Sequence, residues 1–435
     1  MTEDIEQAAE RGLLKNSAFL AIWGAQILSQ VAANAITFAL IVLVAELTKS
    51  NTSSSFLILF SIVPAVLFGI VAGVVVDRSD RKKVLVITNV LRAGAVFPLL
   101  IAGETIVTAY IVNFLVAAIT TFFVPAESAT LPKIVGKRDL MLANSLFTFT
   151  FNGAFLFGFI LLAPVMIRLA GYEVLFILIA AMFVASALLC LTLPATPRPK
   201  THLGVEIAGA AVAQTREGMG EAFRYLQKSP VVAWCLVYVA LTYTLVAVAG
   251  ALAPGFVREV LGTDERNVII IVAPAGMGVI AGIGLLNLIR KRVGYPRAIG
   301  LGLGLCTLAL VGLASARPVA NVFRRAATSA ELGEALPFFV ITVGVIAFAF
   351  GIAYAFITVP AMTIIQLQLH DEIRGRIFGV LNVLVSVFSF LPLVIVGPIA
   401  DLWGVAPVFL GFAVIVAATW LAGRGVRKGL AGVAA

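Results

Sequence analysis

The chain has 435 residues, of which 61% are hydrophobic and only 12% are charged, and its mean hydropathy is +1.07. An ordinary soluble domain has about 25% charged residues, so this composition excludes a soluble globular protein. The net charge of +9 does not indicate nucleic-acid binding. In a membrane protein such an excess reports topology, because Lys and Arg are retained in cytoplasmic loops.

Apolar runs between charged or Pro- and Gly-marked breaks predict twelve membrane-spanning helices, each close to the roughly 20 residues that cross a bilayer. The predicted spans are 17–45, 54–76, 84–102, 106–126, 142–167, 174–193, 231–257, 267–289, 298–314, 337–360, 377–399 and 406–423. Residues 1–16 carry four acids before any apolar stretch and predict a retained cytoplasmic tail instead of a signal peptide.

The positions of the basic residues predict the orientation. With the N-terminus in the cytoplasm, 23 of the 31 Lys and Arg residues fall in inner segments and 7 in outer segments, and Arg92 lies within a span. We therefore expect a multi-pass protein of a plasma membrane of the bacterial inner-membrane type, with both termini cytoplasmic.

Scarce cysteine and histidine exclude several kinds of site. Cys190, Cys235 and Cys306 lie singly in apolar runs, and His202 and His370 are the only histidines. Neither a disulfide framework nor a CxxC or HExxH metal site is present, and no GxxxxGK[ST] loop for ATP occurs. We expect no metal, no cofactor and no enzymatic activity, because no catalytic constellation is visible.

The longest predicted cytoplasmic connection divides the chain into two halves. The predicted domains are the tail 1–16, a six-helix bundle 17–193, a linker 194–230, a second six-helix bundle 231–423 and a cytoplasmic tail 424–435. In the linker, Met219, Phe223 and Leu226 are spaced for one helical face. This predicts an amphipathic helix on the membrane surface, and a regulatory partner site is the alternative.

The two halves resemble repeats. Gly73 is followed by Asp77, Arg78, Asp80, Arg81, Lys82 and Lys83, and Gly282 is followed at the same spacing by the basic triplet Arg290, Lys291 and Arg292. The sequences Phe-Val-Pro-Ala (123–126) and Thr-Val-Pro-Ala (358–361) form a second echo. Two parallel six-span repeats are the architecture of a large transporter class.

The pattern GxxxDRxxRKK after the second span resembles the signature of the major facilitator superfamily. Phe-Val-Pro-Ala (123–126), Ala-Asn-Ser-Leu (143–146) and Arg-Gly-Arg-Ile-Phe-Gly (374–379) resemble its branch of macrolide-efflux-like and enterobactin-exporter-like proteins. The resemblance implies an all-α integral membrane protein, with twelve transmembrane helices in two pseudo-symmetric six-helix bundles. It also implies alternating access, in which one half rocks against the other around a central site.

The resemblance implies a cytoplasmic gate at the signature. In the family the Asp clamps the outward-facing state through a helix N-terminus, which assigns the gate to Asp77 and Arg81, with Gly73 allowing close helix approach. The alternative is a topogenic basic loop with an incidental Asp. The chain departs from the family pattern at Asp80, where Gly is usual, and this puts the backbone conformation of the turn in doubt. The full predicted gate and its second-half echo are Gly73, Asp77, Arg78, Asp80, Arg81 and Lys82, with Gly282, Arg290, Lys291, Arg374 and Arg376.

Acidic residues are absent from the middle of the predicted spans. An ionisable group at mid-bilayer costs at least about 2.5–3.5 kcal/mol and is usually kept for function. Proton antiport through a mid-membrane carboxylate is therefore not supported, and Glu127 or Asp371 near the cytoplasmic mouth is the candidate coupling group. Arg92 approaches the midplane; a structural role is favoured over contact with an anionic substrate group.

Neutral polar residues recur at helical spacing on four spans. Residues three or four apart share a helix face, so each stripe faces protein or water and not lipid. We expect the stripes to line a central cavity, with interhelical hydrogen bonding as the alternative. The candidate cavity residues are Gln26, Gln30, Asn34, Thr37, Asn144, Thr148, Asn152, Tyr238, Thr242, Asn382 and Ser386.

Together these features predict a secondary transporter that exports an amphipathic or moderately large organic compound. The alternatives are a lipid or lysolipid transporter of the same fold and a non-transporting membrane receptor. A channel is not favoured, because no charged ring at mid-depth is visible. The expected partners are a small-molecule substrate, membrane lipids and a coupling ion, proton or sodium, with no nucleic acid, and the protein is expected to be a monomer.

Overall fold

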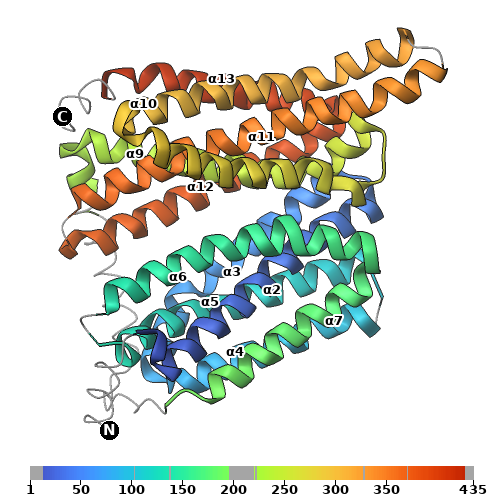
Figure 1. The fold of residues 1–435 in the computed structure, drawn as a ribbon. Coiled ribbons are helices and arrows are strands. Elements are labelled where there is room, and N and C mark those ends of the chain that lie inside the picture. The colour runs from blue at the N-terminus through green and yellow to red at the C-terminus, as the bar shows by residue number, and fades with distance from the viewer. Residues whose placement is uncertain are drawn as a thin grey trace. The chain divides into compact units, whose positions relative to one another are not determined.

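The structure, a computed structural model, describes residues 13–101, 103–136, 139–194, 220, 223–326, 329–369 and 371–426, and these are almost entirely helical (Figure 1). In chain order the elements are η1 (Leu13–Lys15), α2 (Ser17–Thr48), α3 (Asn51–Arg78), α4 (Arg81–Ile101), α5 (Ile106–Ile134), α6 (Leu140–Phe155), the π-helix η2 (Leu156–Leu162), α7 (Ala163–Leu191), α9 (Pro230–Phe256), the π-helix η3 (Val257–Leu261), η4 (Glu265–Val268), α10 (Ile269–Ala326), α11 (Ser329–Gln368), α12 (Asp371–Trp403) and α13 (Val405–Ala422).

Ten helical stretches in the described part of the chain are long and apolar enough to cross a membrane. One of them, Leu142–Leu191, has 50 residues, which at 1.5 Å per residue is far longer than a bilayer is thick. Gly171 interrupts it with a φ of 81°, in the left-handed region that glycine reaches freely, and divides it into two crossings. A shorter apolar stretch, Phe390–Trp403, lies in α12. These stretches account for the predicted spans, and the total of twelve stays a prediction.

Several helices extend beyond the spans predicted for them. The fourth predicted span ends at residue 126, whereas α5 continues to Ile134. Similarly, α10 continues to Ala326 and α11 begins at Ser329, well outside the predicted limits 314 and 337. Apolar runs mark only the part of a helix that lies in lipid, because the polar turns beyond it can bond to water and remain helical.

The chain divides into two compact units. Unit 1 comprises Met1–Thr48 and Leu59–Val212, and unit 2 comprises Lys49–Ile58 and Ala213–Ala435. The helix α3 therefore begins in unit 2 and ends in unit 1, whereas the predicted first bundle held all of it. Of the predicted linker helix, only 220 and 223–228 are described, together with Ser229 and Pro230; there the Tyr225 hydroxyl donates to the Gln368 carbonyl at 3.1 Å.

Unit 1 is built on α2, α4, α5 and α7. The helix α7 packs along both α2 and α4, and α5 packs along α4 (Figure 1). A cluster of buried side chains from these helices includes Phe19, Leu85, Phe123 and Cys190. The side chains that pack together here come from helices far apart in the sequence, so this core holds the four helices of the unit together.

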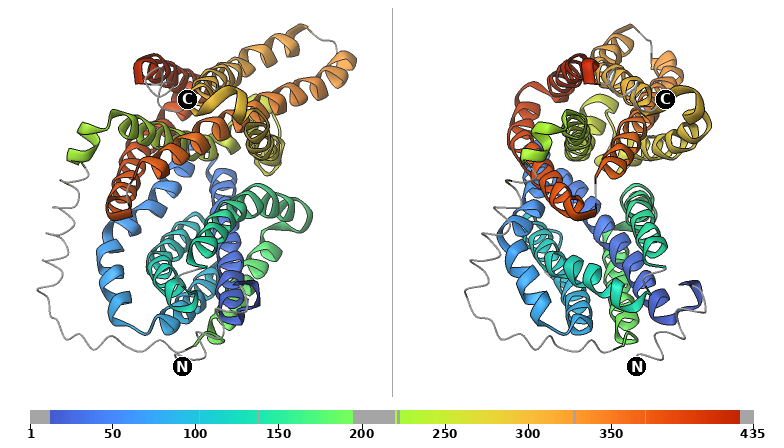
Figure 2. Two further views of the ribbon diagram at one scale, coloured as in Figure 1. Left: turned by 60° about the vertical axis from the view of Figure 1, so that its left-hand side comes forward. Right: turned by 90° about the vertical axis from the view of Figure 1, so that its left-hand side faces the viewer.

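Unit 2 has its most extensive packing between α10 and α11. The part of α10 after Gly294 runs beside the first part of α11 as a long antiparallel pair (Figures 1 and 2). A Cβ atom on Gly278 would overlap the Phe348 carbonyl, and one on Gly351 would overlap the Ala275 carbonyl. Small residues allow such close backbone approach, which holds helices together in lipid where the hydrophobic effect does not.

The outer surface is apolar. Leu288 is 80% exposed, Leu169 is 78% exposed and Phe149 is 77% exposed, while Arg92 and Glu127 are buried. In water this distribution would be unfavourable, because large exposed apolar surface drives association. It is the distribution expected of a protein whose surroundings are lipid.

Candidate functional site

The signature turn joins α3 to α4 and is held by its own polar groups. Asp80 Oδ1 accepts a hydrogen bond from the Lys82 backbone N–H at 3.1 Å, and the Asp80 carbonyl accepts one from Val84 at 3.0 Å. Asp80 is therefore the N-cap of α4, a position that favours Asp. Arg81 Nη1 donates to the Ala129 carbonyl of α5 at 2.9 Å, which fastens the turn to a second helix of unit 1.

The departure at Asp80 leaves the turn unstrained. Among the described residues, the one non-glycine residue with positive φ is Lys49, at 52°. Asp80 therefore does not need the conformational freedom of glycine, which settles the doubt raised by the family pattern. Its carboxylate serves as a cap that glycine does not have.

The structure gives less information on the remaining residues of the predicted gate. Apart from the neighbouring backbone of its own helix, no described atom lies within 4 Å of a Cβ built on Gly73, so the structure shows no close helix approach at this glycine. Arg78 is exposed, and Lys82 is half-buried. The side chain of Asp77 lies outside the described part of the structure, so its role as a gate remains a prediction.

A buried charged group lies inside unit 1. Arg92 is 1% exposed, and its guanidinium carbon lies 4.2 Å from the centre of the Phe123 ring and 4.9 Å from that of Phe183. Its Nη2 donates to Asn89 Oδ1 at 2.9 Å. Stacking between two aromatic faces stabilises a desolvated guanidinium through cation–π attraction.

Glu127 belongs to the same interior. It is 5% exposed, and its Oε1 atom and the Nε atom of Arg92 have no hydrogen-bond partner among the described residues. Unsatisfied buried polar atoms are uncommon and mark places where a water, an ion or a proton has a role. The sequence analysis singled out both residues, but only the structure shows that both are buried in unit 1.

The polar stripe of α2 faces the interior of unit 1 over its first half. Gln26 is 3% exposed and donates from Nε2 to the Phe147 carbonyl of α6 at 3.2 Å, and Gln30 is 7% exposed. Asn34 and Thr37 are half-buried and donate to carbonyls of their own helix, at 2.8 and 2.9 Å. At Gln26 this hydrogen bond favours the interhelical alternative, because it joins α2 to α6.

The stripe on α6 is only partly described. Asn144 is exposed, and the side chains of Thr148 and Asn152 lie outside the described residues. The helix then changes into the π-helix η2, where Gly158 lies so close to α2 that a Cβ would come within 2.5 Å of the Val31 carbonyl oxygen. Such π segments often occur at functional sites. The sequence analysis missed this one.

The polar residues predicted on the seventh span point into unit 2. Tyr238 is 1% exposed and Thr242 is 2% exposed, and the Thr242 hydroxyl donates to the Tyr238 carbonyl at 2.5 Å. The Tyr238 ring lies 5.7 Å from that of Trp234. Both side chains are buried among the described residues, and their place in a central cavity stays a prediction. The side chains of Asn382 and Ser386 are outside the described part of the chain.

In the second-half echo of the signature, the structure describes the surroundings of the glycine, Gly282. A Cβ on Gly282 would lie 2.8 Å from the Cβ of Ala355, so this residue packs α10 against α11. The side chains of the other echo residues and of the candidate coupling acid are not among those described: Arg290, Lys291, Asp371, Arg374 and Arg376.

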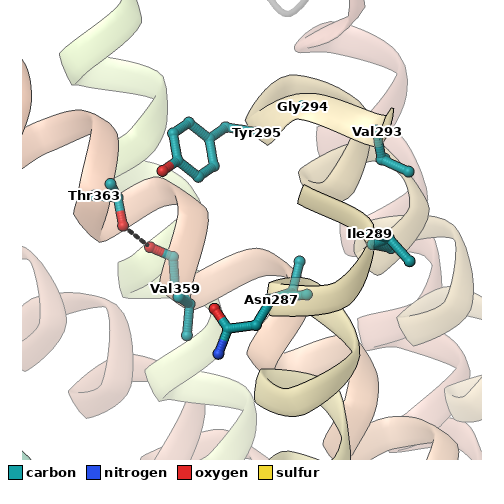
Figure 3. Close-up of a pocket in the computed structure, with 8 residues that line it drawn as sticks. Asn287, Ile289, Val293, Gly294, Tyr295, Val359 and Thr363 are labelled. Atoms are coloured by element: carbon teal, nitrogen blue, oxygen red, sulfur yellow. Dashed lines mark hydrogen bonds between the residues drawn. The ribbon is translucent and has the colours of Figure 1, made fainter. Parts of the chain in front are cut away.

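A small cavity lies where α10 bends, beside α11 (Figure 3). Gly294 has a φ of 67° at this bend, and Asn287, Tyr295 and Thr363 are among the lining residues. The Thr363 hydroxyl donates to the Val359 carbonyl at 2.8 Å, so it is already used within α11. The volume is about 120 Å³, well below the roughly 300–1,000 Å³ of ligand pockets, so this cavity is too small for an organic substrate.

Among the described residues, no group of three or more His, Cys, Asp and Glu side chains could hold a metal ion. The three cysteines are buried and lie apart as free thiols. No cofactor position is defined by these side chains.

A polar cluster that the sequence analysis did not predict surrounds the start of α3 in unit 2. Asp401 accepts hydrogen bonds from the first turn of α3, and Lys49 forms an ion pair with Glu265. One signal was available: Gly397 and Asp401 repeat the four-residue spacing of the Gly73–Asp77 pair. The partners of Asp401 could not be inferred from spacing, because they lie about 350 positions away.

The apolar outer surface and the membrane-length helices of the described residues define a multi-pass helical membrane protein. Residues 22–393 match the Major Facilitator Superfamily, and the chain belongs to this family. The resemblance drawn from the signature is thereby confirmed.

Curated relatives are similar to this chain at low identity. An uncharacterised MFS-type transporter, YfiS of Bacillus subtilis (strain 168), is 23% identical over 381 residues, covering 84% of this chain and 82% of the relative. Macrolide efflux protein A of Streptococcus pyogenes is 32% identical over 131 residues, covering 28% of this chain and 31% of that protein. The second match spans about a third of that relative, so it supports efflux only as a proposal.

Solved structures share the fold. The nucleoside transporter NupG has a TM-score of 0.65 at 16% identity, covering 93% of this chain and 98% of its own. A bacterial homologue of the human lysosomal transporter Spinster has a TM-score of 0.65 at 14% identity, covering 94% and 96%. At these identities the likeness establishes the all-helical transporter fold alone.

Proposed function

We propose that this protein is a secondary transporter that exports an amphipathic or moderately large organic compound by alternating access. The observation that carries the proposal is membership of the Major Facilitator Superfamily over residues 22–393, together with the partial likeness to a macrolide efflux protein. The absence of an ATP-binding loop means that the energy comes from an ion or substrate gradient.

The turn between α3 and α4 is the proposed cytoplasmic gate. Arg81 is held against the Ala129 carbonyl, and Asp80 caps α4, so both lie on a turn that is fixed to unit 1. Asp77 lies one turn before it, at the end of α3. A carboxylate there would be stabilised by a helix N-terminus by about 0.3–1 kcal/mol, which is weak enough to open during a cycle.

The proposed export is tested by counterflow in proteoliposomes. Candidate compounds, with erythromycin as the macrolide and a fluorescent lysolipid as the lipid probe, are supplied with and without imposed proton or sodium gradients. We expect macrolide or another amphipathic compound to accumulate. Movement of the lysolipid alone, independent of gradients, would instead show lipid transport, and no movement of any compound would remove the export proposal.

The gate is tested with Asp77→Asn. We expect transport to fall about two- to fivefold with normal membrane insertion, because the amide keeps the shape but loses the charge that a helix N-terminus attracts. Asp139→Asn, in the loop before α6, is the matched control and should transport normally. Normal counterflow by the Asp77 variant would remove the gate assignment and leave the export proposal standing.

A further inference from the structure

The helix α3 and the two residues before it are divided between the two units. Lys49–Ile58 groups with unit 2, whereas Leu59 and the rest of α3 group with unit 1. Ser54, Ser55 and Leu57 are at most 1% exposed, so one face of this segment is buried, whereas Lys49 at its start is exposed. If the two units move as bodies in a transport cycle, a continuous helix cannot stay attached to both. Either the contact with unit 2 opens or α3 bends, for example at Pro64.

Two glycines of unit 2 make room for the segment. A Cβ on Gly255 of α9 would overlap the side-chain amide of Asn51, and a Cβ on Gly397 of α12 would lie 2.5 Å from the Thr52 Cα. Each glycine is followed four residues later by an acid, Glu259 and Asp401. On α12, Gly397 and Asp401 share one helix face because they are four residues apart. Glu259 lies in the π-helix η3, and a hydrogen bond from Asn51 shows that its carboxylate lies beside α3.

The carboxylate of Asp401 caps α3. Its Oδ1 accepts from the Asn51 N–H at 2.6 Å, and its Oδ2 accepts from the Thr52 N–H at 3.0 Å. Oδ2 also accepts from the hydroxyls of Ser50 and Thr52, each at 2.6 Å. The first N–H groups of a helix have no partner in their own helix and carry a partial positive charge. An acid from α12 therefore completes the start of α3.

Charged side chains beside the cap strengthen the contact. Lys49 Nζ lies 2.8 Å from Oε2 of Glu265, which is 2% exposed and also pairs with Arg258 at 3.4 Å. Lys49 adopts a φ of 52°, in the left-handed region where glycine is preferred after a helix. Its ammonium group is the nearer of the two cations that pair with the buried carboxylate of Glu265. Asn51 Nδ2 donates to Glu259 at 3.1 Å.

We propose that Gly397 and Asp401 hold the start of α3 as a releasable latch, at the end of unit 2 that the predicted orientation places outside. The latch comprises Lys49–Ile58 with Gly255, Glu259, Glu265, Gly397 and Asp401. This inference rests on the proposed alternating access. It adds an acid on α12 that acts on the opposite end of α3 from the signature Asp77, with the same Gly-to-Asp spacing.

The latch is tested by thiol accessibility. Ser55→Cys is introduced into a chain whose Cys190, Cys235 and Cys306 are replaced by Ser, and the purified protein in nanodiscs is labelled with a water-soluble maleimide. Because hydrogen bonds to a charged acceptor are among the strong ones, we expect Asp401→Asn to speed labelling at least about tenfold. Asp264→Asn is the control, because Asp264 is exposed and caps only its own loop at Arg266. An unchanged rate in the Asp401 variant would overturn the latch.

A second pair of variants tests the close packing of α12 against the start of α3. Gly397→Ala places a methyl group against Thr52 and should also speed labelling of the thiol introduced by Ser55→Cys. Gly411→Ala, on the neighbouring α13, is the matched control, because a Cβ there meets no described atom within 4 Å. If both Asp401→Asn and Gly397→Ala label at the parent rate, the segment stays docked and α3 bends instead.

Counterflow with the same variants separates the two proposals. Faster labelling without transport of any tested compound would support the latch and remove the proposed export. Export with labelling at the parent rate in both variants would support the proposed function and remove the latch.

Discussion

The two units share a helical architecture but differ in what holds their helices together. In unit 1, Gly69, Gly73, Gly94 and Gly153 have open space where a Cβ would be, and Gly158 presses against the Val31 carbonyl. In unit 2 the glycines at 255, 278, 282, 302, 351 and 397 press against neighbouring atoms. Close approach at glycine is therefore more extensive in unit 2, whereas unit 1 buries a cation between aromatic rings.

The positions of the charged groups also differ between the units. Arg92 and Glu127 are buried within helices of unit 1, while buried Glu265 and exposed Asp401 lie where helices of unit 2 begin or end. A charge inside a span needs a partner at all times, because the surroundings cannot solvate it. A charge at a helix end can exchange its partner for water. Only the second kind of site is suited to opening and closing.

The largest effect is expected at Arg92. Arg92→Ala should lower the free energy of unfolding by about 3–5 kcal/mol, because it leaves Glu127 buried without a counter-charge and empties the space between Phe123 and Phe183. Thermal unfolding of the purified protein, followed by tryptophan fluorescence, measures the loss. Arg297→Ala, an exposed arginine of unit 2, is the control and should change stability by no more than about 0.5 kcal/mol. Equal stability of the two variants would mean that unit 1 does not depend on its buried cation.

A smaller loss is expected at the α10–α11 contact of unit 2. Gly278→Val should destabilise the protein by about 1–3 kcal/mol, because the added side chain meets the Phe348 backbone and forces the helices apart. Gly284→Val, six residues further along α10, is the matched control, since a Cβ there meets no described atom within 4 Å. Both variants have the same change in helix propensity. If they unfold at the same temperature, close backbone approach does not distinguish unit 2.

The smallest effect tests a single interhelical hydrogen bond of unit 1. Trp23 Nε1 donates to Thr150 Oγ1 at 2.7 Å, joining α2 to α6. Thr150→Val should cost about 0.6 kcal/mol, the average for such bonds in a membrane protein, and should shift the Trp23 emission. Thr307→Val is the control, because its hydroxyl donates to Leu303 of its own helix. A control loss as large as the Thr150 loss would mean that the interhelical bond contributes nothing.

Much of the fold followed from local composition, and the candidate site only partly did. Apolar runs predict that the protein lies in a membrane and where the apolar parts of its helices are. One motif, GxxxDRxxRKK, predicts the family. By contrast, Gln26 was predicted to line a cavity, yet its amide bonds to the Phe147 carbonyl of α6. Periodicity identifies the face of a helix that avoids lipid, but it does not distinguish a neighbouring helix from water.

Glycine shows the same limit. Gly73 and Gly278 both stand in spaced glycine pairs, with Gly69 and Gly282, yet only Gly278 lies against another backbone. Spacing places two glycines on one face, but the neighbour that makes them useful comes from elsewhere in the chain. The signature turn was more predictable, because Asp80 caps the helix that follows it directly and needs no distant partner.

The sequence by itself determined that this chain lies in a membrane, that its basic residues are concentrated on one predicted side, and that it carries the signature of its family. These properties are local, because each residue contributes its own transfer free energy to the lipid or water around it. The tertiary structure alone decided that Asp401 caps a helix beginning 350 positions away, that Lys49 pairs with Glu265, and that Arg92 lies between two aromatic rings. Those contacts depend on which helices become neighbours, and no run or spacing within one helix contains that information.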